Sequence, residues 1–339
     1  MNSSLLTQEI GSLRKPKWLV KTLREKSSSE EEREKAREDA ALLNVVLLEK
    51  AGLDIVYDGE ARRVEMYEYS AKRIKGMRFS GRVRSWDAKY YRKARCVGKV
   101  GYTGNYHLDE FNFVRDRATK MIKVPITGAY TIADWSYNEA YATKRELALD
   151  LASKVLRPLV RDLVEAGAEF IQVDEPAATT HPHEMKLVVD SFNETVREIS
   201  GVKFGIHICY SGNNYEALFP EALRMKNHQY ALEFANRDSW ELGRGRDVRT
   251  GYKALDMFSS QNENKEIGLG VVDVHVDRVE SPQLIRDRVL YAVDVVGDPS
   301  LIHVNPDCGL RTRSREIAFL KLSNLVKGVL LAKTELGLL

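Results

Sequence analysis

Four side chains that can bind a metal ion lie at the ends of short β-rich runs. His207 and Cys209 are one residue apart in GIHICYSGNN, so both project from the same face of an extended strand. Glu233 and Cys308 end two later runs, in LEFAN and NPDCG. Imidazole, two thiolates and a carboxylate make a tetrahedral zinc set, and sulfur ligands disfavour magnesium and calcium. The sequence therefore predicts that His207, Cys209, Glu233 and Cys308 bind one Zn²⁺.

This metal prediction has competing explanations. A lone His-x-Cys pair is weak support, because a free cysteine is often only a small buried hydrophobic residue. Cys308 at another strand end strengthens the prediction, whereas Cys96 has no histidine beside it and is not expected to bind metal. Structural zinc sites use cysteine-rich sets that are close together in sequence. A set spread over three strands therefore favours a reactive site over a structural one.

Other polar residues also end β-rich runs: Ser12, Glu60, Asp174 and His275. A buried charge costs several kcal/mol unless it is paired or ligated, so a hydrophobic core has no use for so many of them. We therefore expect these side chains to face a common polar cavity. For Glu60 and Asp174 the alternative is structural pairing with a nearby arginine, such as Arg62 or Arg63.

The elements that must position these residues follow an alternating pattern. Short apolar runs alternate with stretches of helical periodicity such as SPQLIRDRVLYAVDVV. Continuous apolar runs are typical of parallel strands that are buried on both faces. The eight strand candidates are LLTQEIGS, LDIVYDGE, KVPITGAY, EFIQVDEP, VKFGIHICY, QYALEFAN, EIGLGVVDVH and LIHVNPDCG. They predict an α/β fold, a single (β/α)₈ TIM barrel. The alternative is a doubly wound sheet, which usually carries a glycine-rich phosphate-binding motif, and GLGVVD does not match that motif.

One segment breaks the repeat. Residues 74–124 are long, aromatic and basic, and we expect an antiparallel excursion between strands two and three. Long insertions after barrel strands lie on the catalytic face. We expect one catalytic domain over residues 1–339, with the zinc and substrate site at the C-terminal face of its strands.

Composition narrows the function further. A net charge of +3 against 52 basic and 49 acidic residues does not indicate nucleic-acid binding, although the basic, aromatic RVRSWDAKYYRKARCVGK could suggest it. Three cysteines argue against a secreted disulfide framework. The N-terminus lacks a signal-peptide layout, and charges break the longest apolar runs. We therefore expect a cytoplasmic protein that binds neither nucleic acid nor a membrane.

Several motifs, in this order, resemble the catalytic barrel of cobalamin-independent methionine synthase, in a short form without a second barrel. They are EIGSLRKP, DGE, RCV, ADWS, VDEPA, HICYS, LEFANRD, DVH and NPDCGLRTR. The resemblance implies zinc on the same four residues and homocysteine as methyl acceptor. It also implies that the substrate carboxylate meets Ile10, Gly11 and Ser12, and that its ammonium group meets Glu60 and Asp174. Backbone N–H groups suit a carboxylate, and two carboxylates suit an ammonium ion.

The methyl donor is the open part of this prediction. Family members with two barrels use a methylated folate; Trp135 would then stack on the pterin, Arg95 would lie at the donor site, and His275 would supply a proton as the catalytic acid. Trp135 could equally be a packing residue at the barrel rim. Thr180 stands where the family has an acidic residue, and VDRVES departs from its usual continuation.

These departures favour a methylcorrinoid (methylcobalamin), free or on a corrinoid protein, over 5-methyltetrahydrofolate. The predicted activity is zinc-dependent homocysteine S-methyltransferase, forming methionine. The alternatives are the same reaction with 5-methyltetrahydrofolate, and alkyl transfer to another thiol such as coenzyme M. Coenzyme M has a sulfonate and no ammonium group, so it would leave Glu60 and Asp174 without a role.

Overall fold

The fold is given by a computed structural model that describes residues 4–84, 90–209, 215–261 and 265–339. The chain divides into two compact units, and each is described by itself. The first comprises Met1–Arg62, Phe113–Lys123 and His228–Leu339, and the second comprises Arg63–Asn112 and Val124–Asn227. Helix α4 (Leu108–Arg115) crosses from the second unit into the first.

The first unit is built on parallel strands in the order β1-β12-β11-β10. The residues of β10 and β12 are all buried, as expected of strands covered on both faces. Its strands are β1 (Leu6–Thr7), β2 (Ile55–Val56), β5 (Met121–Ile122), β10 (Gln229–Leu232), β11 (Glu266–Val272) and β12 (Ile302–Pro306). Its helices are α1 (Lys17–Arg24), α2 (Glu30–Ala51), α9 (Leu255–Gln261), α10 (Pro282–Val296) and α11 (Arg315–Glu335).

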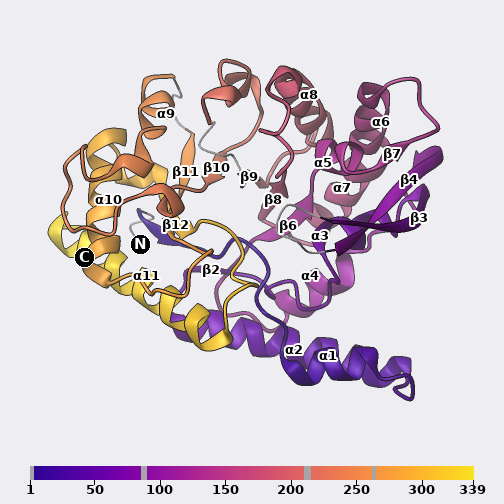
Figure 1. The fold of residues 1–339 in the computed structure, drawn as a ribbon, viewed down its shortest axis with the longest axis horizontal. Helices are drawn as coiled ribbons and strands as arrows, with labels where there is room; N and C mark the ends of the chain where they lie inside the picture. Colours follow the sequence, from indigo (N-terminus) through magenta and orange to yellow (C-terminus); the bar gives the residue numbers. More distant parts are fainter. Residues whose placement is uncertain (1–3, 85–89, 210–214, 262–264) are drawn as a thin grey trace. The chain divides into compact units, whose positions relative to one another are not determined.

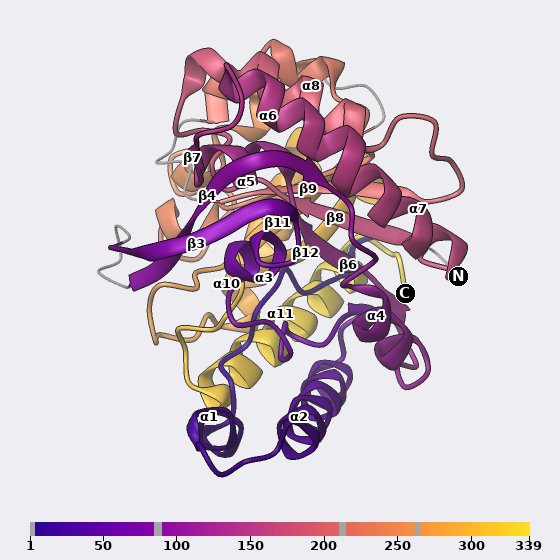
Figure 2. The ribbon, with the colours of Figure 1, turned by 90° about the vertical axis from the view of Figure 1, so that its right-hand side faces the viewer.

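The second unit has a parallel sheet in the order β6-β8-β9 and a long antiparallel ribbon, β3–β4, that also pairs with β7. Figure 2 shows the two strands of this ribbon running side by side. The strands are β3 (Lys75–Arg84), β4 (Tyr90–Gly101), β6 (Val124–Thr127), β7 (Tyr137–Asn138), β8 (Phe170–Asp174) and β9 (Lys203–Ile208). The helices are α3 (Met66–Ala71), α5 (Ala129–Asp134), α6 (Lys144–Leu151), α7 (Arg157–Glu165) and α8 (Met185–Thr195), with a π-helical segment, Ala152–Leu156, joining α6 to α7.

Local sequence explains where the long helices begin. Ser29 caps α2 in a capping box with Glu32, which satisfies two backbone N–H groups that the first turn leaves free. Ser281 and Ser314 cap α10 and α11 in the simpler way, each accepting from a backbone N–H three residues on. Figure 1 shows α2 and α11 of the first unit lying alongside each other.

All eight predicted strands are present, as β1, β2, β6, β8, β9, β10, β11 and β12. The α/β fold with parallel strands is confirmed, but a closed eight-stranded barrel is not: among the described residues β2 forms its ladder with β5, and it meets the β1 segment through the isolated bridge of Gln8 with Ile55 and flanking backbone hydrogen bonds. The excursion contains the expected antiparallel pairing, although its residues 85–89 lie outside the described residues. One domain over residues 1–339 stays a prediction. Among the described helices, none has the length and hydropathy needed to span a bilayer.

Candidate functional site

In the second unit, two parallel strands bring three predicted site residues together. Asp174 ends β8 and is the register partner of His207 on β9. Cys209 directly follows β9, and all three residues are at least 95% buried. The side-chain amide of Gln172 donates a hydrogen bond to Oδ1 of Asp174 at 2.7 Å, which fixes that carboxylate. A carboxylate, an imidazole and a thiol therefore meet at one edge of this sheet.

A buried acid next to Asp174 connects this edge to α5. The carboxylate of Glu175 accepts hydrogen bonds from the N–H of Tyr130 at 3.1 Å and from the N–H and hydroxyl of Thr131 at 2.7 and 2.6 Å. A carboxylate suits the N-terminus of a helix. Burial nevertheless raises the pKa of Glu175 to about 7, against the lowering effect of these donors. Glu175 thus holds the start of α5, the helix whose C-terminal cap is Trp135.

The two predicted donor-site residues lie in a partly exposed region of the second unit. Trp135 packs edge-on against Tyr67, with ring centroids 5.8 Å apart. It belongs to an apolar cluster with Met66, Met77 and Phe79. Trp135 therefore has a packing role, as the alternative explanation expected, and a partly exposed face.

Arg95 is engaged by another residue. Its Nε and Nη2 lie 2.6 and 2.5 Å from the two carboxylate oxygens of Glu139, because β4 pairs with β7 at this position. This bidentate geometry is the strongest that arginine makes with a carboxylate. A donor that used Arg95 would have to compete with Glu139.

In the first unit, Glu233 and Cys308 follow neighbouring parts of the sheet. Glu233 is 1% exposed, directly after β10, and Oε2 lies 3.4 Å from Nδ2 of Asn236 and 3.5 Å from Arg237. Cys308 follows β12 and is half-buried. A carboxylate has more acceptor sites than these two contacts use, so a metal ion is a chemically suitable further partner for Glu233.

Asp307 joins these two strand ends. Its Oδ1 accepts from the N–H groups of Phe234 and Ala235, both at 3.0 Å, and its Oδ2 accepts from the N–H of Asn236 at 2.7 Å. Burial raises the pKa of Asp307 to about 7, although the three N–H groups act to lower it. The residue before Cys308 thus fixes the backbone that follows Glu233.

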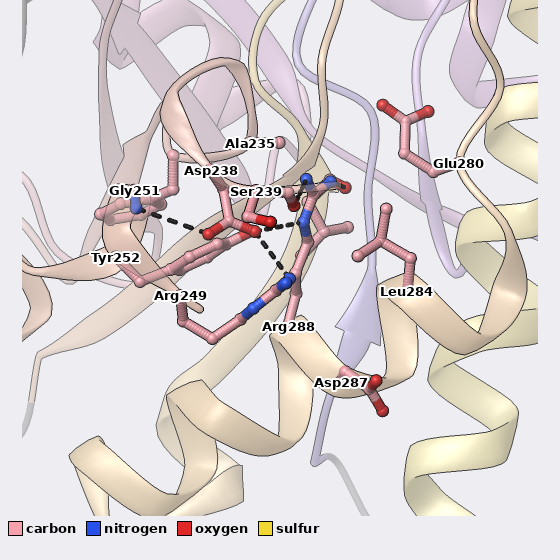
Figure 3. Close-up of polar contacts among 12 residues, drawn as sticks. Ala235, Asp238, Ser239, Arg249, Gly251, Tyr252, Glu280, Leu284, Asp287 and Arg288 are labelled. Carbon is pink, nitrogen blue, oxygen red and sulfur yellow. Dashed lines mark hydrogen bonds and ion pairs between the residues drawn. The ribbon is translucent and has the colours of Figure 1, made fainter. Parts of the chain in front are cut away.

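A second buried acid supports the same loop (Figure 3). Oδ2 of Asp238 lies 2.7 Å from Nη1 of Arg249 and 2.8 Å from Nε of Arg288, and all three side chains are fully buried. Arg288 also donates to the carbonyl of Val271 at 2.8 Å, in β11. The loop after Glu233 is therefore anchored at both ends, by Asp307 and by Asp238.

Glu60 adopts an unusual backbone conformation in the segment that follows β2. Its φ is +55° and that of Gly59 is +58°, a left-handed region that costs a residue with a side chain about 1–2 kcal/mol. The N–H of Glu60 donates to Oδ1 of Asp58 at 2.8 Å, which helps to hold this conformation. Strain of this kind clusters at functional sites.

The predicted carboxylate-binding turn lies beside Glu60. A Cβ placed on Gly11 would lie 3.1 Å from Oε1 of Glu60, so the Glu60 carboxylate borders Ile10–Gly11–Ser12. On its other side, a Cβ on Gly309 would lie 2.6 Å from the nitrogen of Ser12, so the segment after Cys308 also reaches this turn.

The two arginines that could pair with Glu60 for a structural purpose, Arg62 and Arg63, form ion pairs with other carboxylates. Arg62 pairs with Glu34 at 3.2 Å, and Arg63 forms a buried ion pair with Glu110. His275, the predicted proton donor, is exposed after β11, and its backbone N–H donates to Oδ1 of Asp273 at 2.7 Å.

Within the second unit, Asp174, His207 and Cys209 lie together, and within the first unit the Ile10–Gly11–Ser12 turn lies beside Glu60 and the segment after Cys308. Sequence reasoning missed the clamps, Glu175 and Asp307, although both are acids adjacent to a predicted site residue, in VDEPA and NPDCG. That adjacency was the available signal.

Comparison with known proteins identifies the family and the fold. The family described as cobalamin-independent synthase, catalytic domain, matches residues 6–329. A methionine synthase of Thermoplasma acidophilum is 44% identical over 336 residues, covering 96% of this chain and 97% of that protein. A methionine synthase of Thermococcus kodakarensis is 42% identical over 337 residues, covering 98% and 95%. The structure of a B12-independent methionine synthase from Shewanella sp. W3-18-1 with selenomethionine superposes with a TM-score of 0.86 at 24% identity, covering 99% and 100% of the two chains, which shows the fold.

Proposed function

The chain belongs to the family of cobalamin-independent synthase catalytic domains and is a methyltransferase, and we propose that it transfers a methyl group to the sulfur of homocysteine, forming methionine. The main support for this proposal is that each unit has two residues able to bind a metal ion at the ends of its strands. They are Glu233 and Cys308 in the first unit and His207 and Cys209 in the second. Each pair lies next to a buried acid, Asp307 or Glu175, that fixes the local backbone.

The donor chemistry fits zinc. The proposed ligands are His207, Cys209, Glu233 and Cys308, and among the described residues His207, Cys209 and Cys308 are a set that could hold a metal ion. Imidazole and thiolates suit zinc rather than magnesium or calcium. When bound, zinc would lower the pKa of the substrate thiol, ordinarily about 8.5, and so supply the nucleophilic thiolate at neutral pH.

Two features support an amino-acid substrate. The turn Ile10–Gly11–Ser12 offers backbone N–H groups for a carboxylate, and the acids Glu60 and Asp174 suit an ammonium group. The Shewanella relative holds selenomethionine, which carries the same carboxylate and ammonium groups beside a soft chalcogen. Coenzyme M lacks the ammonium group, so homocysteine is the thiol we propose.

The methyl donor requires a correction to the sequence-based preference. The family is described as cobalamin-independent and the structural relative as B12-independent, which goes against methylcobalamin. The donor we propose is therefore 5-methyltetrahydrofolate. Trp135 would then offer its exposed face to the pterin, and exposed His275 would give a proton to the leaving nitrogen. Thr180 remains a departure from the family pattern at this site.

A donor assay tests the proposal. Zinc-loaded protein is incubated with homocysteine and either 5-methyltetrahydrofolate or free methylcobalamin, and methionine is measured. We expect methionine with the folate, and His275→Ala should lower the rate about 100-fold or more if His275 is the general acid. If methionine forms with methylcobalamin and not with the folate, the methyl donor is a corrinoid and not 5-methyltetrahydrofolate. Failure with both donors, together with no binding of homocysteine, would refute the proposed function.

A further inference from the structure

Glu9 is a buried carboxyl group whose environment the proposed chemistry does not explain. It is 4% exposed, and neither of its carboxylate oxygens has a hydrogen-bond partner among the described residues. The N–H of Tyr57 lies close enough to affect its ionisation but makes no hydrogen bond of ordinary geometry with it. Leaving a charged carboxylate in that condition would cost several kcal/mol.

The position of Glu9 links it to the proposed amino-acid site. It comes one residue before the Ile10–Gly11–Ser12 turn, and its N–H donates to the carbonyl of Ile55 in β2 at 3.4 Å. The segment that follows β2 carries Asp58 and Glu60. Glu9 and Glu60 thus come from adjacent strand ends within the first unit.

The charges that act on Glu9 are mostly negative. Burial raises its pKa well above the usual value, Asp58 and Glu60 raise it further, and Lys123 is the cation that lowers it. The ammonium group of Lys123 lies 3.0 Å from Oε1 of Gln8 and is itself buried. A second lysine, Lys15, donates to the backbone carbonyls of Glu60 and Ala61 at 3.0 Å. Two lysines beside three carboxyl groups leave this cluster able to accept a further positive charge.

We propose that Glu9 is a third carboxyl group of the amino-acid site, and that it releases its proton when the ammonium group of the substrate binds beside Glu60. This inference rests on the proposed function, since it assumes an amino-acid ligand. In the empty site the neutral acid avoids an unpaired buried charge. In the filled site the ammonium group brings N–H donors and a positive charge, the proton goes to solvent, and the carboxylate accepts one of those hydrogen bonds.

The consequence is a proton released by binding of the amino acid itself, separate from the proton of the homocysteine thiol. L-Methionine is the appropriate probe because it has the ammonium and carboxylate groups and no thiol. Isothermal titration of zinc-loaded protein at pH 7 in phosphate and in Tris, which differ widely in ionisation enthalpy, measures this proton. We expect about one proton released per methionine bound.

Three variants assign the proton. Glu9→Gln keeps the shape of the side chain but cannot ionise, so it should bind methionine more weakly and without proton release. Glu9→Asp keeps an ionisable group and should still release the proton. Glu31→Gln, the same change on the exposed side of α2, is the matched control and should behave as the wild type.

The possible results separate this inference from the proposed function. Methionine binding with no proton release in the wild type, or with equal release in Glu9→Gln, would overturn the role of Glu9 and leave the proposed function standing. No binding of methionine or homocysteine would overturn both. Zinc content and circular dichroism of each variant show that the folded protein is being compared.

Discussion

Oδ1 of Asp307 accepts a hydrogen bond from the N–H of Phe234 at 3.0 Å, so the residue before one proposed zinc ligand holds the residue after another. The two residues are 73 positions apart in the chain. The carboxylate also accepts from the N–H groups of Ala235 and Asn236, so it binds three successive backbone N–H groups. This arrangement makes the positions of Glu233 and Cys308 depend on each other within the first unit.

Asp307→Asn should therefore weaken metal binding without removing a ligand. Both carboxylate oxygens of Asp307 accept hydrogen bonds from backbone N–H groups, whereas an asparagine has one acceptor oxygen. Its NH₂ group would therefore point at a backbone N–H, and at least one hydrogen bond would be lost. Loss of an outer partner of this kind typically lowers metal affinity or activity 10–100-fold. Zinc affinity from competition with a chromogenic chelator measures the effect. Asp298→Asn, the same change at the exposed turn before β12, should leave it unchanged, and equal affinities in the two variants would contradict the clamp.

Cys308→Ser should abolish both stoichiometric zinc and methionine formation, because a serine hydroxyl stays protonated and is a poor ligand for zinc. Elemental analysis of the purified protein and the donor assay are the measurements. Cys96→Ser is the matched control: Cys96 is buried in β4, and its thiol donates to the carbonyl of Gly98 at 3.3 Å. That variant should keep its zinc. Full zinc content and full activity in Cys308→Ser would overturn the ligand set.

The contact between Glu175 and the start of α5 gives a steric prediction. A Cβ on Gly128 would lie 2.1 Å from Oε1 of Glu175, so Gly128→Ala must displace the carboxylate or the helix. Overpacking of this kind usually costs about 1–3 kcal/mol in the free energy of unfolding. The variant should also lose activity, because α5 leads to Trp135. Gly81→Ala has open space around it and is the control; urea unfolding compares the two. Equal stability of the two variants would show that Glu175 can move freely.

Much of this site follows from sequence because its residues end buried parallel strands. Apolar runs such as EFIQVD predict such strands, and the polar residue that follows each run then falls at a common edge. The strands themselves are shorter at the start of the chain than their sequences suggest: the runs around β1 and β2 pair over only two residues each. Local patterns do not report such a break in pairing.

The supporting interactions could not be predicted in the same way. Glu175 binds α5 across more than 40 positions, Asp307 binds the loop after Glu233 across more than 70, and Arg95 finds Glu139 at a separation of 44. No local spacing encodes partners so far apart. The left-handed backbone of Glu60 is also invisible in sequence, because this region favours glycine or asparagine and gives no reason to expect a glutamate.

His107 provides a pH-dependent prediction away from the proposed ligands. It is 1% exposed, its Nδ1 lies 3.4 Å from Oε1 of Glu110, and Arg63 pairs with the same carboxylate. Burial, and then the charge of Arg63, lower the pKa of His107 to about 4. In the unfolded chain the value is about 6.5. Between these values the unfolded state binds more protons, so His107 makes the protein less stable as pH falls from about 6.5 to about 4.

Replacing His107 by glutamine should remove this dependence. Free energies of unfolding in urea at pH 7.5, 6.0 and 5.0 would be compared, and the wild type should lose up to about 1.4 kcal/mol more per pH unit than His107→Gln below pH 6.5. His228→Gln, the same change at an exposed position, should keep the wild-type dependence. Parallel curves for the wild type and His107→Gln would show that His107 takes up a proton in the folded protein, with Glu110 stabilising the cation against both burial and Arg63.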